Sequence, residues 1–123
     1  MELERIKKFT FNGEEYQVEV PTVGQYLDIE NQKIVNSDGH WLDLIKSQTV
    51  SALRSVQIIE CVSVLKVLCP SLFKNMKVLS YREIDAVDFI ELLSIYNNII
   101  NPWYSSWFKN FNEIILEGNK KEE

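Results

Sequence analysis

A chain of 123 residues is long enough for one ordinary domain and too short for two. Hydrophobic residues make up 46% of it and charged residues 25%, a balance typical of a folded protein rather than a disordered one. The net charge of −5 argues against a nucleic-acid-binding protein, because such proteins neutralise phosphates with clustered Lys and Arg.

The first segment, about residues 5–20, carries the pattern of a β-hairpin. Asn12-Gly13 supplies the positive φ angles that a tight primed turn requires. Apolar residues flank this turn and alternate after it: Ile6, Phe9, Phe11, Tyr16, Val18 and Val20. A lone hairpin is marginal in water, so its apolar side is expected to pack on helices or on another chain. Its exposed edge is a candidate for strand addition, although charged residues there discourage non-specific pairing.

Helical signals follow the hairpin. Thr22 and Gln25 fit a capping box, Pro70 ends a long apolar helix, and Pro102 fits the first position of a final helix. The predicted helices lie at about residues 22–36, 40–47, 50–69, 71–77, 84–100 and 102–117. Residues 118–123 are predicted to be a polar, flexible tail. The expected fold is mainly α with a short N-terminal β-hairpin (α+β), a small helical bundle that forms a single domain over residues 1–117.

The helix predicted around residues 50–68 is apolar on all sides. Such a helix either lies at the centre of a core or shares part of its surface with a partner. Full enclosure is hard to reach in so small a domain, so both alternatives stay open. The candidate partner-binding residues on this helix are Val56, Ile59, Val64 and Val67.

The stretch "NPWYSSWFKNF" is the most aromatic part of the chain. On the helix predicted there, seven large apolar residues fall within one arc of about 140°: Trp103, Tyr104, Trp107, Phe108, Phe111, Ile114 and Ile115. A stripe of this width is typical of the buried side of an amphipathic helix. Trp107 and Phe111 are expected in the core. Trp103 and Tyr104 are expected nearer its edge and complete the set of candidate partner contacts.

The sequence offers little for catalysis, metal binding or a cofactor. His40 is the only histidine and has no second ligand at a zinc-binding spacing. Cys61 with His40 is the one nucleophile–base pair that can be constructed, and an apolar helix interior disfavours the thiolate. The acids between Glu83 and Glu91 suit a helix N-terminus, whose dipole favours negative charge. We therefore expect a protein that is not an enzyme and has no cofactor.

The longest apolar region does not fit a membrane span. Arg54, Glu60 and Lys66 interrupt the segment from Val50 to Leu68. Cys61 and Cys69 are expected to be buried free thiols in a reducing cytoplasm.

Three stretches together carry a resemblance to a known family. They are "FTFNGEEYQVEVPTVGQYLDIENQK", "ALRSVQIIECVSVLKVLCPSL" and "DAVDFIELLSIYNNIINPWYSSW". Their order is a hairpin, a Pro-Thr helix start, apolar helices and a Pro-Trp segment before an aromatic helix. With this order of elements, the chain resembles the tail assembly chaperones of long-tailed bacteriophages over about Phe9 to Phe111.

The resemblance implies a non-catalytic protein of the host cytoplasm that binds the apolar, helix-rich tape measure protein during tail assembly. It also implies contact with other tail proteins and leaves self-association open. The alternative is a structural virion subunit of the tail or baseplate that oligomerises through the same apolar surfaces. No membrane or nucleic-acid partner is expected.

Overall fold

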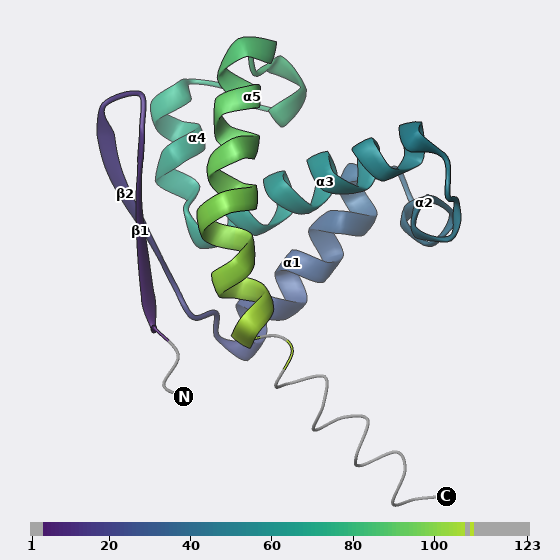
Figure 1. The fold of residues 1–123 in the computed structure, drawn as a ribbon, viewed down its shortest axis with the longest axis horizontal. Coiled ribbons are helices and arrows are strands. Elements are labelled where there is room, and N and C mark those ends of the chain that lie inside the picture. The colour runs from purple at the N-terminus through teal and green to yellow at the C-terminus, as the bar shows by residue number, and fades with distance from the viewer. Residues whose placement is uncertain (1–3, 108, 110–123) are drawn as a thin grey trace, which may run out of the picture. The chain divides into compact units, whose positions relative to one another are not determined.

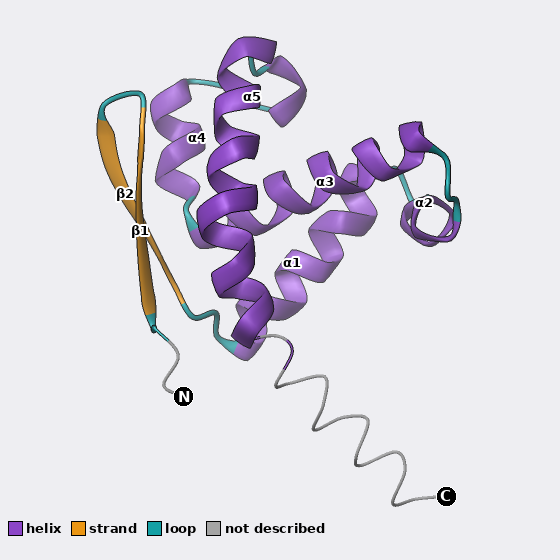
Figure 2. Ribbon diagram, in the orientation of Figure 1, coloured by secondary structure: helices purple, strands orange, loops and turns teal. Residues whose placement is uncertain are grey.

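The computed structural model describes residues 4–107 and 109 (Figure 1). Helices dominate, and the strands form one two-stranded antiparallel hairpin near the N-terminus (Figure 2). This confirms the predicted mainly α fold with a short N-terminal hairpin. The chain forms two compact units, Met1–Val20 with Ser94–Glu123, and Pro21–Leu93. The expectation of one domain over residues 1–117 stays a prediction.

The hairpin joins β1 (Ile6–Phe11) to β2 (Glu14–Glu19). Asn12 and Gly13 take φ angles of 50° and 79°, as a tight primed turn requires. Phe9 pairs with Tyr16 across the strands, and their rings stack with centroids 5.5 Å apart. One face of the hairpin is therefore apolar and buried: Phe9, Phe11, Tyr16 and Val18.

The second unit is built around α3 (Val50–Leu68), which contacts α1 (Val23–Asn36), α2 (Trp41–Lys46) and α4 (Pro70–Met76) (Figure 1). The buried residues of α3 lie mostly in its second half, from Ile59 to Leu65. Ser63 is fully buried there and accepts a 3.0 Å hydrogen bond from the Asn36 side-chain amide. That bond offsets the unfavourable burial of a hydroxyl group.

The capping box predicted at the start of α1 is confirmed. The Gln25 N–H donates to Thr22 Oγ1 at 3.1 Å, and the Thr22 N–H donates to Gln25 Oε1 at 2.9 Å, which completes the capping box. Pro70 occupies the first turn of α4, where its missing N–H leaves no bond unmade. After the short 3-10 turn η1 (Tyr81–Glu83), Asp85 Oδ1 accepts from the Val87 N–H at 2.8 Å and caps the next helix.

The expected break before Pro102 is absent, and this corrects the sequence prediction. α5 (Ala86–Ile95) continues into a π-helical turn, η2 (Tyr96–Ile100), and helix then extends through residues 101–107. The Asn101 N–H bonds to the Tyr96 carbonyl, five residues back. Pro102 explains the wider turn, because it has no N–H and its ring crowds the carbonyl four residues earlier. The chain widens the helix here instead of ending it.

Candidate binding surfaces

The four candidate contacts on α3 are largely covered by the chain itself. Ile59 and Val64 are buried, while Val56 and Val67 are half-buried. Most of the second half of this all-round apolar helix therefore lies in a core. A role in partner binding for these four residues stays a prediction.

Exposure along the aromatic face runs opposite to the expected order. Trp103 and Tyr104 are buried, with 8% and 6% of their surfaces exposed, whereas Trp107 is half-buried. The placing of Trp103 and Tyr104 nearer the edge is thus wrong for this structure, and their role as partner contacts stays a prediction. The Trp103 indole N–H donates to the Glu4 carbonyl, which draws the ring inward. The side chain of Phe108, together with Phe111, Ile114 and Ile115, falls outside the described residues.

The most exposed apolar row within one helix lies on α1. Val23, Leu27 and Ile34 are 77%, 59% and 52% exposed. At about 100° per residue they fall within about 40° of one another, on the side opposite to Ile29, the one buried residue of α1. We call these three residues the α1 stripe. The structure places them on the outer side of their helix.

Further exposed apolar residues lie on α2 and on the first turns of α3. They are Leu42, Ile45, Val50 and Leu53. α2 has no buried residue, and it lies at the N-terminal end of α3 (Figure 1). This end of the second unit thus leaves much of its apolar surface uncovered by the described chain.

A charged cluster joins α1 to its neighbours. Lys33 Nζ lies 3.1 Å from Glu30 Oε1 and 5.5 Å from the centre of the Trp41 ring. Burial raises the pKa of Glu60 on α3, and the positive charge of Lys33 partly opposes that rise. Because its side chain is only 13% exposed, Lys33 has a structural role here.

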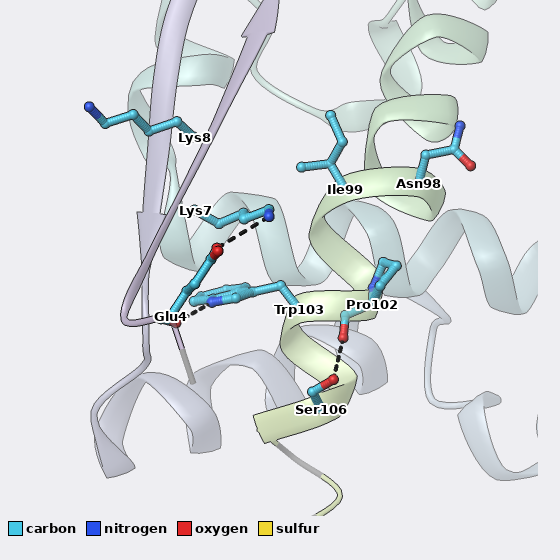
Figure 3. A pocket seen from close by; sticks show the side chains of 8 residues that line it. All are labelled: Glu4, Lys7, Lys8, Asn98, Ile99, Pro102, Trp103 and Ser106. Atoms are coloured by element: carbon cyan, nitrogen blue, oxygen red, sulfur yellow. Dashed lines mark hydrogen bonds and ion pairs between the residues drawn. The ribbon is translucent and has the colours of Figure 1, made fainter. Parts of the chain in front are cut away.

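The surface of the described residues includes two hollows of interest. The larger, of about 520 Å³, lies in the first unit between β1 and the helix that follows α5 (Figure 3), and we call it the β1 hollow. Its walls are Glu4, Lys7, Lys8, Asn98, Ile99, Pro102, Trp103 and Ser106. The smaller, of about 130 Å³, lies in the second unit beside Tyr81, whose hydroxyl donates to the Asn36 carbonyl at 3.2 Å.

The chemistry of the described residues gives no support to a catalytic or metal site. Burial raises the pKa of the Cys61 thiol to about 12, so the thiolate is strongly disfavoured at neutral pH. His40 is exposed, with Nδ1 3.6 Å from Asp43 Oδ2. Within residues 4–107 and 109, no group of three His, Cys, Asp or Glu side chains is placed to hold a metal ion.

No single helix in the described part of the chain is long and apolar enough to cross a membrane. α3 and α4 meet that requirement only as a pair, and they are bent by 102° where they join.

Comparison with known proteins finds no relative. No family model matches the chain, and neither a curated protein nor a solved structure matches it.

Proposed function

We propose that this protein is a non-catalytic tail assembly chaperone of a long-tailed bacteriophage. In this role it binds an apolar helical segment of the tape measure protein in the host cytoplasm. The observation that carries the proposal is the α1 stripe, where three large apolar side chains point away from the core of their unit. The resemblance of the sequence to tail assembly chaperones suggests the tape measure protein as the partner.

A row of this kind is suited to a helical partner. Residues spaced as Val23, Leu27 and Ile34 lie along one line of a helix, and a second amphipathic helix can bury such a line along its length. Large apolar side chains that are exposed together on one helix face are candidates for an interaction site in soluble proteins. The net charge of −5 favours solubility of the protein while this surface is uncovered.

Co-expression with the tape measure protein of the same genome tests the proposal. A tagged chain is expected to retain the tape measure protein in the soluble fraction and to co-purify with it. Leu27→Glu and Ile34→Glu should reduce recovery of the partner at least about tenfold, because each places a charge in an apolar contact. Val87→Glu, at a residue 75% exposed on α5, is the matched control and should leave recovery unchanged.

Two results would count against the chaperone. One is the absence of any complex with the tape measure protein. The other is an equal loss of partner in the α1 and α5 variants, which would mean that the α1 stripe has no special part in binding.

The alternative is a structural subunit that uses the same surfaces to oligomerise in the tail or baseplate. Mass spectrometry of purified virions separates the two functions. A chaperone leaves the assembled particle, whereas a structural subunit remains in a fixed number of copies. A tape measure reading frame directly downstream of this gene would favour the chaperone.

A further inference from the structure

The outer edge of β1 has hydrogen-bonding groups that β2 does not use. In the register of the hairpin, Phe9 faces Tyr16 and Lys7 faces Val18, and the Val20 N–H donates to the Arg5 carbonyl at 2.9 Å. In an antiparallel pair, alternate residues exchange both main-chain bonds with the partner strand. The odd-numbered residues of β1 therefore bond to β2. The main-chain groups of Ile6, Lys8 and Thr10 point to the other edge.

The β1 hollow lies along β1 and away from β2. Residues of β1, of the segment before it and of the helix after α5 line it, and no residue of β2 does. In Figure 3 the Lys7 ammonium points toward the helix, while the Lys8 ammonium points away. Lys8 therefore lines the hollow with its main chain and the first part of its side chain. At ~3.3 Å per residue, the wall from Glu4 to Lys8 gives room for about four residues of extended chain.

The opposite wall combines apolar surface with polar groups. Ile99, Pro102 and the Trp103 ring form its apolar part (Figure 3). The π turn precedes Pro102, which has no N–H to donate to the Asn98 carbonyl. π turns are frequent at functional sites. Asn98 and Ser106 contribute polar side chains.

The charge of the hollow favours an acidic ligand. Lys7 pairs with Glu4 at 3.2 Å, but the two side chains are 33% and 66% exposed, so that the pair is weak and open to exchange. An incoming carboxylate can take the place of Glu4 beside Lys7. The Lys8 ammonium points away from the helix, so its positive charge acts from outside the hollow.

We propose that the β1 hollow binds an extended acidic peptide, which adds to the edge of β1 as a third strand. The main chain of the peptide bonds to Ile6, Lys8 and Thr10, one acidic side chain pairs with Lys7, and a neighbouring apolar side chain packs on Ile99 and Trp103. Strand addition explains why β1 forms one wall of the hollow. A small molecule would favour a more enclosed and more apolar pocket.

This site uses none of the residues of the α1 stripe, so its test is independent of the tape measure protein. The probe is a capped, fluorescein-labelled heptapeptide of alternating glutamate and valine, titrated with the full chain and followed by fluorescence anisotropy. The same peptide with lysine for glutamate tests charge. A third version, N-methylated on alternate residues, tests main-chain bonding, since methylation removes the donors along one edge.

Proline substitutions provide a matched pair of variants. Lys8→Pro removes an N–H that faces the hollow, while Gln17→Pro removes the outward N–H of the residue opposite, on the β2 edge. Neither change removes a bond between β1 and β2. Lys8→Gln keeps the N–H and removes only the charge. Lys7→Glu reverses the charge inside the hollow.

The glutamate peptide is expected to bind the wild-type protein and the Gln17→Pro variant equally, within about twofold. Lys8→Pro and Lys7→Glu should each weaken binding at least about tenfold, and Lys8→Gln should have a smaller effect than Lys8→Pro. The lysine and N-methylated peptides should not bind. If Lys8→Pro disturbs the fold by circular dichroism, Lys7→Glu carries the comparison alone.

Several results with the peptides and variants would overturn the proposal. They are no binding of the glutamate peptide, equal binding of the N-methylated peptide, equal loss in both proline variants, and full displacement by free glutamate at the concentration of the peptide. Dimerisation of the chain that Lys8→Pro abolishes would also overturn it, because the occupant would then be a second copy.

Discussion

Trp103 donates its indole N–H to the main-chain carbonyl of Glu4, a residue 99 positions earlier in the chain. The bond fixes the segment before β1 to the helix that follows α5, and it forms part of the wall of the β1 hollow (Figure 3). Because the ring is only 8% exposed, it contributes both apolar burial and a polar link to its unit. Trp103 therefore joins two ends of the sequence that no helix or strand connects.

Truncation of this side chain should separate the two contributions. Trp103→Ala is expected to lower the free energy of unfolding by ~3–5 kcal/mol, as for other buried aromatic residues. Trp103→Phe keeps most of the apolar contact and loses the hydrogen bond, so a smaller loss of ~1–2 kcal/mol is expected. Urea unfolding followed by circular dichroism measures both. Trp107→Ala is the control, and its effect should be smaller because that ring is half-buried.

Pro102 should be the cause of the π turn at Tyr96–Ile100. Pro102→Ala restores an N–H and removes the clash with the preceding turn, so the helix can adopt regular α geometry. We expect the free energy of unfolding to rise by ~1–3 kcal/mol. Pro70→Ala is the matched control, since Pro70 stands in the first turn of α4, where proline is well tolerated. That variant should gain nothing.

A loss of stability in Pro102→Ala would show that packing around the turn, and not the proline, holds the π geometry. Amide hydrogen exchange across residues 96–101 distinguishes the cases. Relaxation to an α-helix should slow exchange there, while a π turn held by packing should leave it unchanged.

The elements that the sequence predicts well are those that local chemistry decides. Asn12-Gly13 has few alternatives to a primed turn, and Thr22 with Gln25 satisfies N–H groups at the start of α1. The predicted helix break at Asn101 is wrong because proline is compatible both with the first turn of a helix and with a distorted turn inside one. Only the backbone shows that the helix widens to accept it.

Which apolar residues are exposed is harder to predict from the sequence, because it depends on how the helices pack against one another. α1 has apolar residues on two sides, and its sequence cannot say which side meets α3. The structure turns Ile29 inward and leaves Val23 and Leu27 outside. Likewise, the free edge of β1 follows from the hairpin pattern, whereas the hollow beside it requires Pro102 and Trp103 from the far end of the chain.

Loss of the capping box should weaken α1. Thr22→Ala removes the acceptor for the Gln25 N–H and is expected to lower the free energy of unfolding by ~1 kcal/mol. Thr22→Ser keeps the hydroxyl and should retain most of the stability. When Gln25→Ala is combined with Thr22→Ala, the further loss of stability should be small and should come only from other contacts of Gln25 within the helix. The reason is that the two hydrogen bonds of the capping box depend on each other. A full additional loss from Gln25→Ala would mean that the side chain acts mainly through other contacts. Thermal unfolding of all four proteins makes the comparison.

Glu60 should make stability depend on pH. Burial raises its pKa in the folded state above the ordinary value of 4.5, and Glu30 adds to the rise while Lys33 opposes it. The folded state therefore favours the protonated form. Its stabilising contribution is fully present below pH 4.5 and is lost as pH rises through the folded-state pKa. At neutral pH the ionised carboxylate weakens the fold.

Glu60→Gln replaces the titrating group with a neutral side chain of the same shape. At pH 7 it is expected to raise the melting temperature by ~2–4 °C, and the gain should shrink toward zero as pH falls below 4.5. Glu91→Gln, at an exposed position on α5, corrects for the loss of one negative charge. Calorimetry between pH 3.5 and 7.5 measures the difference. A gain in melting temperature that stays constant with pH would mean that Glu60 titrates alike in the folded and unfolded states. A lower melting temperature of Glu60→Gln at pH 7 would mean that the attraction between Glu60 and Lys33 is stronger than the cost of burying the carboxylate.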